Sequence, residues 1–289
     1  MEISGRTKVC GVLGDPVEHS LSPMMHNAAF RELDLDFVYV AFKVKKDGLS
    51  DAITGAKKLG VHGLNATTPH KQLVMNYLDE VDSTVKSIGA ANTILSLHGK
   101  LVGYNTDGLG ALRALRENNV SLHKKKLLLL GAGGAGRAIA FYLAQETEEL
   151  VILNRTINKA RVLAKFIREK FNKRVTGGTL SPIVIEKELE NADILINATS
   201  VGMYPQTHRS LVDPSWLRPS LGVMDIIYNP LETKLARDAK SAGAKVVSGV
   251  EMLVYQGAAS FKIWTKQPAP IRLMKQTVSK KISEMKGST

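Results

Sequence analysis

The chain has 289 residues, of which 44% are hydrophobic and 23% charged, and its formal net charge is +12. This length allows two domains with separate cores, and this composition excludes an intrinsically disordered chain. The positive charge does not point to nucleic acid, because the lysines are dispersed and only 6% of the residues are aromatic, too few for stacking against bases. We therefore expect a solvated basic surface and no nucleic-acid partner.

Three features predict a cytoplasmic protein with no membrane partner. Met1 is not followed by the apolar core of a signal peptide, and no stretch approaches the roughly 20 apolar residues of a membrane span. The single cysteine, Cys10, permits no internal disulfide, which suits a reducing compartment. Triplets at Asn65, Asn154 and Asn197 match the N-glycosylation acceptor pattern, but a cytoplasmic chain stays unmodified there.

Strand and helix patterns alternate in the first part of the chain. The first helix is expected to have Ser22 at its N-cap and Pro23 at its first helical position. The alternation predicts an α/β domain over residues 1–106, and an amphipathic helix at 106–119 is expected to lead into a second domain. The strands are expected at 8–14, 37–44 and 61–67, and the helices at 20–33 and 49–60.

The second domain begins with KKLLLLGAGGAGRAIAFYLAQ, residues 125–145. An apolar strand precedes Gly131, Gly133 and Gly136, and an alanine-rich helix follows them, which is the setting in which G-x-G-x-x-G binds a pyrophosphate. The alternative is a strand–helix turn that binds no nucleotide. Further apolar strands predict a doubly wound, mostly parallel Rossmann domain over 107–250; they are expected at 149–154, 192–198, 222–228 and 244–249.

The end of the second strand of this domain favours NADP over NAD. An NAD site usually has an acidic residue there for the ribose 2′-hydroxyl. This strand ends instead in Asn154, Arg155 and Thr156, with Lys159 close behind. A guanidinium and a hydroxyl suit a 2′-phosphate, so we expect NADP as the cofactor; the alternative is that Arg155 is simply solvated. The last segment, 251–289, is expected to be helical and to pack back on the first domain.

Several further stretches are distinctive: SLSP (20–23), NATTPHK (65–71), GAANT (89–93), NTD (105–107), DIIYNP (225–230) and GVEMLVYQG (249–257). Together with the glycine loop, they resemble the shikimate dehydrogenase family, and the resemblance covers nearly the whole chain. One departure is Ala66, where the family usually has valine, and this small apolar exchange puts little in doubt.

The resemblance implies a reversible NADPH-dependent reduction of 3-dehydroshikimate to shikimate. It assigns Lys71 and Asp107 as the pair that binds the reacting hydroxyl and passes its proton, and the formal base of the pair stays open. The implied substrate residues are Ser20, Ser22, Thr67, Lys71, Asn92, Asp107, Tyr228 and Gln256. The implied cofactor residues are Gly131, Ala132, Gly133, Gly134, Ala135, Asn154, Arg155, Thr156, Lys159, Thr199, Met203, Ile226 and Gly249.

Some alternatives stay open. Ser22 can be a helix cap as well as a ligand to the substrate carboxylate. A quinate/shikimate dehydrogenase is a close rival, and a non-catalytic NADP-binding regulator is a rival of another class. The histidines show no spacing typical of metal ligands, so we expect no metal. The sequence is compatible with a monomer or a homodimer.

Overall fold

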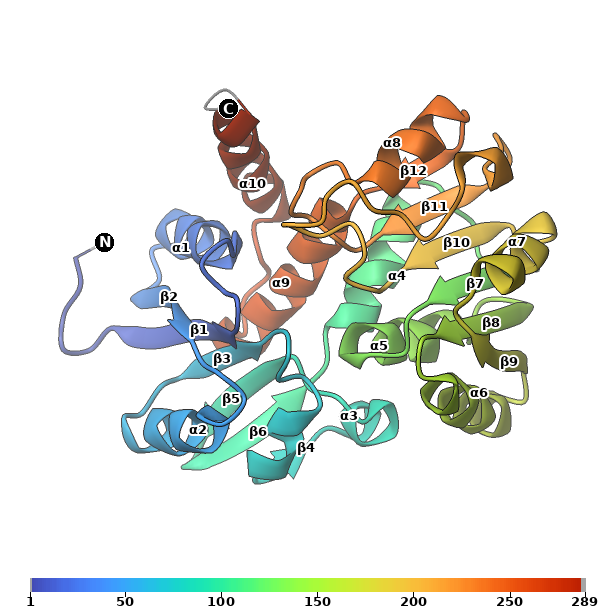
Figure 1. The fold of residues 1–289 in the computed structure, drawn as a ribbon. Helices are drawn as coiled ribbons and strands as arrows, with labels where there is room; N and C mark the ends of the chain where they lie inside the picture. The colour runs from blue at the N-terminus through green and yellow to red at the C-terminus, as the bar shows by residue number, and fades with distance from the viewer. Residues whose placement is uncertain (1, 287–289) are drawn as a thin grey trace. The chain divides into compact units, whose positions relative to one another are not determined.

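The computed structural model describes residues 2–286, which fold into two compact units (Figure 1). The first unit combines residues up to Asp107 with those from Val254 onward, and the second spans Gly108–Leu253. Each unit contains one six-stranded sheet. This confirms the predicted α/β class. Within residues 2–286 no helix is long and apolar enough to cross a membrane.

The sheet of the first unit is mixed, with strand order β2-β1-β3-β5-β6-β4. β1 pairs in parallel with β2 and β3, whereas β5 and β6 form an antiparallel hairpin that the sequence analysis did not assign. The turn residues His98 and Gly99 both have positive φ, as a two-residue hairpin turn requires. The strands are β1 (Lys8–Gly14), β2 (Phe37–Lys43), β3 (Gly63–Ala66), β4 (Glu80–Val81), β5 (Thr93–Leu97) and β6 (Lys100–Tyr104).

Helix α1 corrects one expectation. The helix starts at Ser22, its N-cap is Leu21, and no side chain caps it. Ser22 is therefore the first helical residue and not the N-cap, because the carbonyl of Leu21 already accepts the first helical hydrogen bond, from Met25 N–H at 3.2 Å. The helices of this unit are α1 (Ser22–Glu32), α2 (Leu49–Lys58), α3 (Ser83–Ile88), α9 (Gly249–Thr265), which starts in the second unit, and α10 (Ile271–Lys286), with the 3₁₀ helix η1 (Leu73–Tyr77).

Aromatic packing joins the C-terminal part of α9 to the N-terminal strands. The His26 ring stacks on Tyr39 at 4.6 Å between centroids and lies 5.3 Å from Trp264. Burial lowers the pKa of His26 to about 3, so the ring is neutral and packs as a core aromatic. Trp264 Nε1 donates to the Ile94 carbonyl at 2.9 Å. An added Cβ at Gly63 would lie 2.4 Å from that indole nitrogen, so this close approach requires glycine.

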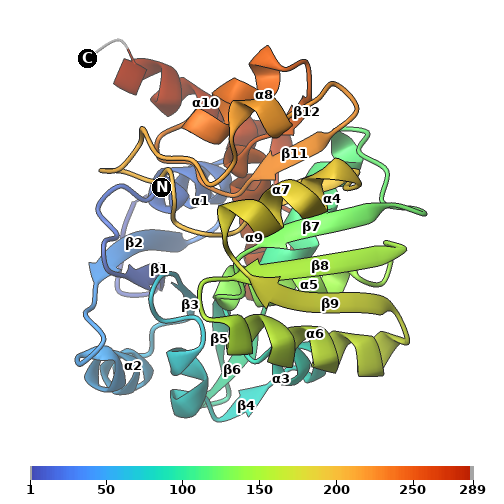
Figure 2. The ribbon, with the colours of Figure 1, turned by 45° about the vertical axis from the view of Figure 1, so that its right-hand side comes forward.

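The sheet of the second unit is entirely parallel, in the order β12-β11-β10-β7-β8-β9. Figure 2 shows its strands in a row, with α7 in front of them. Leu127–Leu130 of β7 are fully buried, as expected for a central strand covered on both faces. The strands are β7 (Lys126–Leu130), β8 (Glu149–Asn154), β9 (Arg174–Thr179), β10 (Ile194–Asn197), β11 (Gly222–Asp225) and β12 (Lys245–Val247).

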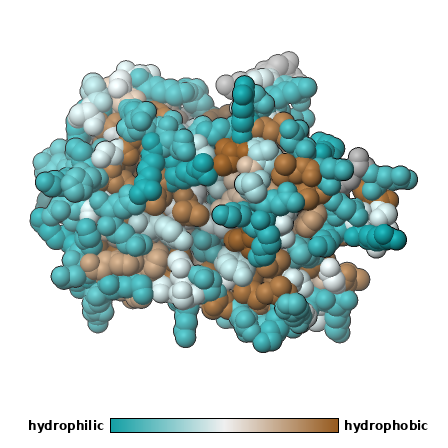
Figure 3. Space-filling model, turned by 180° about the vertical axis from the view of Figure 1, so that it is seen from behind, coloured by the Kyte–Doolittle hydropathy of each residue, from teal (hydrophilic) through white to brown (hydrophobic). Residues whose placement is uncertain are grey.

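The strand order reverses between β7 and β10, and the carboxyl ends of these two strands define the point where doubly wound folds bind ligands. Strand β9 and helix α7 were not assigned from the sequence. The helices are α4 (Asp107–Glu117), α5 (Gly134–Leu143), α6 (Ile157–Phe171), α7 (Pro182–Glu190) and α8 (Lys234–Ser241), with η2 (Pro214–Trp216). Hydrophilic side chains cover most of the face seen in Figure 3, in keeping with the expected solvated surface.

Candidate active site

The NATTPHK loop follows β3 and is tied down by backbone hydrogen bonds. Thr67 N–H donates to Leu13 O at 2.9 Å, and His70 N–H donates to Thr67 O at 2.7 Å. The His70 ring donates through Nε2 to the carbonyl of Val44 at 2.6 Å, and Lys71 O accepts from the N–H of Ala91 at 2.8 Å. The loop is therefore fixed to β1, to the end of β2 and to the GAANT segment. The backbone of Lys71 is held in place by these bonds, so its side chain extends from a defined position.

Lys71 and Asp107 form an ion pair. Lys71 Nζ lies 2.6 Å from Asp107 Oδ2, and the two side chains are 19% and 3% exposed. The other carboxylate oxygen, Oδ1, accepts from Asn92 Nδ2 at 3.0 Å. Asp107 N–H donates to Asn105 Oδ1 at 3.0 Å, and Asp107 lies in the first turn of α4, where the helix dipole favours a negative charge. The pair thus has a fixed geometry and one partly accessible member, Lys71.

Asn92 is held in one orientation by the backbone. Its Oδ1 accepts from Thr106 N–H at 2.8 Å, and a backbone N–H can only donate. The amide nitrogen of Asn92 must therefore face the other way, toward Asp107 and toward Gln256 Oε1 at 3.2 Å. The structure thus brings Lys71, Asp107, Asn92 and Gln256 into one connected group.

A second buried layer of hydroxyl groups supports this group, and the sequence analysis missed it. Ser260 Oγ lies 2.7 Å from Thr93 Oγ1 and 3.2 Å from Thr106 Oγ1. Asn65 Nδ2 donates to Thr93 Oγ1, and Asn65 Oδ1 accepts from the Tyr39 hydroxyl at 2.7 Å. Asn65 is only 7% exposed, so the glycosylation pattern at this position coincides with a buried structural amide.

Ser20, Ser22 and Thr67 lie at the same edge of the sheet. β1 and β3 are parallel neighbours, so the segments that follow them leave from one edge; Asp15 N–H donates to Thr68 O at 3.0 Å. Ser22 is buried, whereas Ser20 and Thr67 are partly exposed. Tyr228, the remaining predicted substrate residue, belongs to the second unit.

The glycine loop has the backbone geometry that phosphate binding needs. Gly131 has φ of +108°, and its N–H donates to Leu153 O at 2.7 Å. A Cβ at Gly136 would lie 2.2 Å from Gly131 O, whereas a Cβ at Gly133 would meet nothing within 4 Å. Gly136 thus allows close packing of α5, and the space over Gly133 is open at the N-terminus of that helix. Ala132, Gly134 and Ala135 complete the turn, and the cradle fits a pyrophosphate.

The predicted 2′-phosphate residues lie at the end of β8 and directly after it. The Asn154 amide joins this segment to the glycine loop: Oδ1 accepts from Ala132 N–H at 3.0 Å, and Nδ2 donates to Thr156 O at 3.0 Å. Arg155, Thr156 and Lys159 are exposed, and Thr156 occupies the N-cap of α6 without a side-chain cap bond. Two cations beside an uncapped helix N-terminus suit a phosphate group.

The remaining predicted cofactor residues follow β10, β11 and β12. Asn197 Oδ1 accepts from Thr199 N–H and from the Thr199 hydroxyl, at 3.1 and 2.7 Å. A Cβ at Gly249 would lie 2.5 Å from Ile226 O, so glycine permits close approach there. Met203 is partly exposed in the loop after β10. These three strand ends adjoin in the sheet because β10, β11 and β12 are parallel neighbours.

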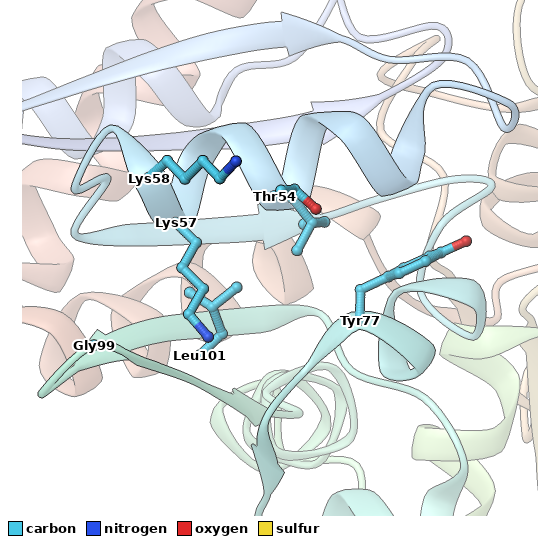
Figure 4. A pocket seen from close by; sticks show the side chains of 7 residues that line it. Thr54, Lys57, Lys58, Tyr77, Gly99 and Leu101 are labelled. Carbon is cyan, nitrogen blue, oxygen red and sulfur yellow. The ribbon is translucent and has the colours of Figure 1, made fainter.

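An open pocket of about 570 Å³ lies elsewhere on the first unit (Figure 4). Lys57, one of its lining residues, is paired with Asp79 at 2.8 Å. The predicted site residues do not line this pocket, and the chemistry lies in the polar groups described above. Across the residues that the structure describes, no group of three histidine, cysteine or acidic side chains could hold a metal ion.

Comparison with known proteins gives matches over nearly the whole length. Residues 12–94 match the shikimate dehydrogenase substrate binding domain, residues 113–221 the shikimate/quinate 5-dehydrogenase family, and residues 249–278 the shikimate 5′-dehydrogenase C-terminal domain. The NADP(+) shikimate dehydrogenase of Methanocaldococcus jannaschii is 48% identical over 98% of this chain and 100% of that protein.

Two solved structures are also similar. A shikimate dehydrogenase in complex with NADP⁺ has a TM-score of 0.90 and 48% identity, covering 97% of this chain and 98% of that one. The shikimate 5-dehydrogenase of Listeria monocytogenes, in complex with shikimate and NAD, has a TM-score of 0.87 and 35% identity, covering 96% of this chain and 98% of that one.

Proposed function

The chain belongs to the shikimate dehydrogenase family and catalyses the reversible NADPH-dependent reduction of 3-dehydroshikimate to shikimate, and from this premise we propose that Lys71 and Asp107 transfer the proton. The observation that carries the proposal is the 2.6 Å contact between Lys71 Nζ and Asp107 Oδ2. The other carboxylate oxygen is held by Asn92 at 3.0 Å, so the pair is pre-oriented for a hydroxyl group.

The chemistry needs one hydride and one proton. NADP, when bound, supplies the hydride acceptor for alcohol oxidation and, in its reduced form, the hydride donor for the reverse reaction. The alcohol proton leaves to the Lys71–Asp107 pair as the carbonyl forms, and the pair returns a proton to the oxygen in the reduction. Lys71 Nζ can donate to the substrate oxygen in both directions, and the Asp107 carboxylate stabilises the ammonium charge.

We further propose how the substrate is anchored. Ser20, Ser22 and the phenol of Tyr228 bind the carboxylate of shikimate, and Thr67, Asn92 and Gln256 bind its ring hydroxyls. This is supported by the common sheet edge of Ser20, Ser22 and Thr67, and by the bond from Asn92 to Gln256. Serine-to-alanine variants should raise KM for shikimate and leave KM for NADP unchanged. Equal rises in both constants would instead mark the serines as structural.

For the cofactor we propose that the glycine loop holds the pyrophosphate and that Arg155, Thr156 and Lys159 hold the 2′-phosphate. Asn154 is included in this cofactor site, because its amide bonds both to the glycine loop and to Thr156. Thr199, Met203, Ile226 and Gly249 contact the nicotinamide half. Support comes from the open space over Gly133 and from the exposed cations after β8.

The organisation of the chain is also part of the proposal. We propose a substrate domain over 1–106, a Rossmann domain over 107–250 and a segment over 251–289 that completes the first domain. The unit boundaries after Asp107 and Leu253 support this division. A cytoplasmic location is in keeping with the buried free thiol of Cys10, and the working form is a monomer or a homodimer.

A double-mutant cycle tests the proton-transfer pair. Lys71→Ala and Asp107→Asn should each lower kcat by about 10²–10⁴-fold, the usual contribution of a proton carrier. The double variant should be little worse than either single one, because the two side chains act as a unit. Circular dichroism checks that each variant is folded. A folded Lys71→Ala protein that keeps more than about half of its kcat would remove Lys71 from the mechanism.

A further inference from the structure

Asp225 is a buried carboxylate that the mechanism above does not use. It ends β11, is 2% exposed, and lies at the carboxyl edge of the second sheet. It accepts hydrogen bonds from Asn197 Nδ2 at 3.1 Å, Ile227 N–H at 3.1 Å and the Thr233 hydroxyl at 2.6 Å. Among residues 2–286 its hydrogen-bond partners are all neutral. Burying a carboxylate that is bonded only to neutral donors costs desolvation energy. We therefore expect this carboxylate to have a role that offsets the cost.

The three donors come from three different segments. Asn197 ends β10, and its Oδ1 fixes both the N–H and the hydroxyl of Thr199. Ile227 belongs to the turn that follows Asp225 itself. Thr233 is the N-cap of α8, where its Oγ1 accepts from Ala236 N–H at 3.2 Å. The single carboxylate thus ties together the loop after β10, the turn after β11 and the start of α8.

The start of α9, at Gly249, packs closely against the same turn. A Cβ at this position would lie 2.4 Å from Ile227 O and 2.5 Å from Ile226 O. The backbone of Ile226 and Ile227 is therefore packed against the start of α9, and the N–H of Ile227 donates to the Asp225 carboxylate. The backbone bond from Ile226 N–H to Asn197 O, at 3.1 Å, adds a further link between the two loops.

We propose that Asp225 is a positioning residue for the nicotinamide half of NADP. It holds the loop after β10, with Thr199, and the turn after β11, with Ile226, in the arrangement that binds this half of the cofactor. The inference rests on the proposed function, which assigns Thr199, Ile226 and Gly249 to that half of the cofactor. Asp225 itself acts through Asn197 and Ile227, and it needs no contact with the cofactor.

The donors explain why an amide cannot replace the carboxylate. Thr233 Oγ1 already accepts from Ala236 N–H, so its own hydrogen needs an acceptor, which Asp225 Oδ2 provides. An asparagine at this position can serve Asn197 and Ile227 with its oxygen, but its NH₂ group then faces the Thr233 hydroxyl. Even if that NH₂ group donates to Thr233 Oγ1, the hydroxyl hydrogen of Thr233 has no acceptor, and a buried donor is left unsatisfied.

Two ligands separate a positioning role from a merely structural one. NADPH spans both halves of the site, whereas adenosine 2′,5′-bisphosphate lacks the nicotinamide half. The dissociation constant of each is measured by fluorescence and calorimetry without shikimate, for the parent, Asp225→Asn, Thr233→Val and the matched control Thr233→Ser. Asp225→Asn and Thr233→Val should bind NADPH about tenfold more weakly and the bisphosphate within twofold of the parent. Thr233→Ser keeps the hydroxyl and should match the parent.

Hydrogen exchange of the ligand-free proteins gives a second readout. The N–H of Val201 donates to Thr199 Oγ1 at 3.1 Å and so reports on the same loop. In Asp225→Asn the amides of Thr199, Val201 and Ile227 should exchange at least tenfold faster, while those of β7 keep their parent rates. Unchanged NADPH binding in the variants, or equal weakening of both ligands, would overturn the inference and leave the proposed function intact. A parent protein that binds neither ligand would refute both together.

Discussion

Asn92→Leu is expected to lower both the free energy of unfolding and kcat/KM for shikimate. The side chain is 2% exposed and bonds to Thr106 N–H at 2.8 Å and to Asp107 Oδ1 at 3.0 Å. Leucine has a similar size but leaves the buried Thr106 N–H without an acceptor and the carboxylate without one donor. Each loss costs about 1–3 kcal/mol, so the free energy of unfolding should fall by about 2–6 kcal/mol. A protein in the upper half of the usual range of about 5–15 kcal/mol stays folded after that loss.

The assay has two parts. Urea unfolding of the parent and variant gives the change in the free energy of unfolding from the midpoint and slope. Steady-state kinetics should show kcat/KM for shikimate reduced by at least tenfold. The NADPH dissociation constant should stay within twofold, because Asn92 lies in the first unit and the glycine loop in the second.

A second variant examines the contact to Asp107. Asn92→Asp keeps an acceptor for Thr106 N–H but places a second buried carboxylate against Asp107, so at pH 7 it should lose at least as much stability and activity as the leucine variant. An Asn92→Leu protein that loses less than about 0.5 kcal/mol of stability and keeps its kcat/KM would refute the reasoning.

Three further predictions concern the second unit. Arg155→Ala should shrink the preference for NADP over NAD by about tenfold or more, the loss expected for a charge-assisted contact, in paired kcat/KM measurements; equal efficiency of the parent with both cofactors would contradict it. Burial raises the pKa of Asp225 to about 6 from an ordinary value of 3.8, so its contribution to stability is present below pH 4 and is lost as the pH rises through 6. Melting curves from pH 4 to 7 should show a decline for the parent that is smaller for Asp225→Asn, and parallel curves would refute this. Gly136→Ala should destabilise the fold, because its Cβ would lie 2.2 Å from Gly131 O, whereas Gly133→Ala should keep its stability and weaken NADPH binding; equal stability of the two variants would contradict the geometry.

The parts of the fold that were predicted from the sequence are those with strong local signals. Leu127–Leu130 form a continuous apolar run that is followed at once by the glycines, and β7, the turn and α5 lie where this pattern predicts them. The relatives confirm the family and the use of NADP. The hairpin of β5 and β6 was missed because its turn uses His98 at positive φ, a weaker signal than Asn-Gly. Strand β9 contains Gly177 and Gly178, which mask a strand pattern.

The site depends on contacts that local patterns do not encode. Lys71 and Asp107 are separated by 36 positions, and Thr93 and Ser260 by 167. Only the arrangement of β5, β6 and α9 brings them together. The roles of Lys71 and Asp107 were therefore predicted through family resemblance, whereas the buried layer around Ser260 and the carboxylate of Asp225 had no local signal and were not predicted.

The central claim is that this chain interconverts shikimate and 3-dehydroshikimate with NADP, and its most direct test is absorbance at the NADPH band. The purified protein is mixed with shikimate and NADP, with quinate or NAD substituted in parallel reactions. Absorbance should rise only when protein, substrate and cofactor are all present, and most steeply with shikimate and NADP. No rise with that pair would contradict the account, and an equal rise with quinate would make the enzyme a quinate/shikimate dehydrogenase.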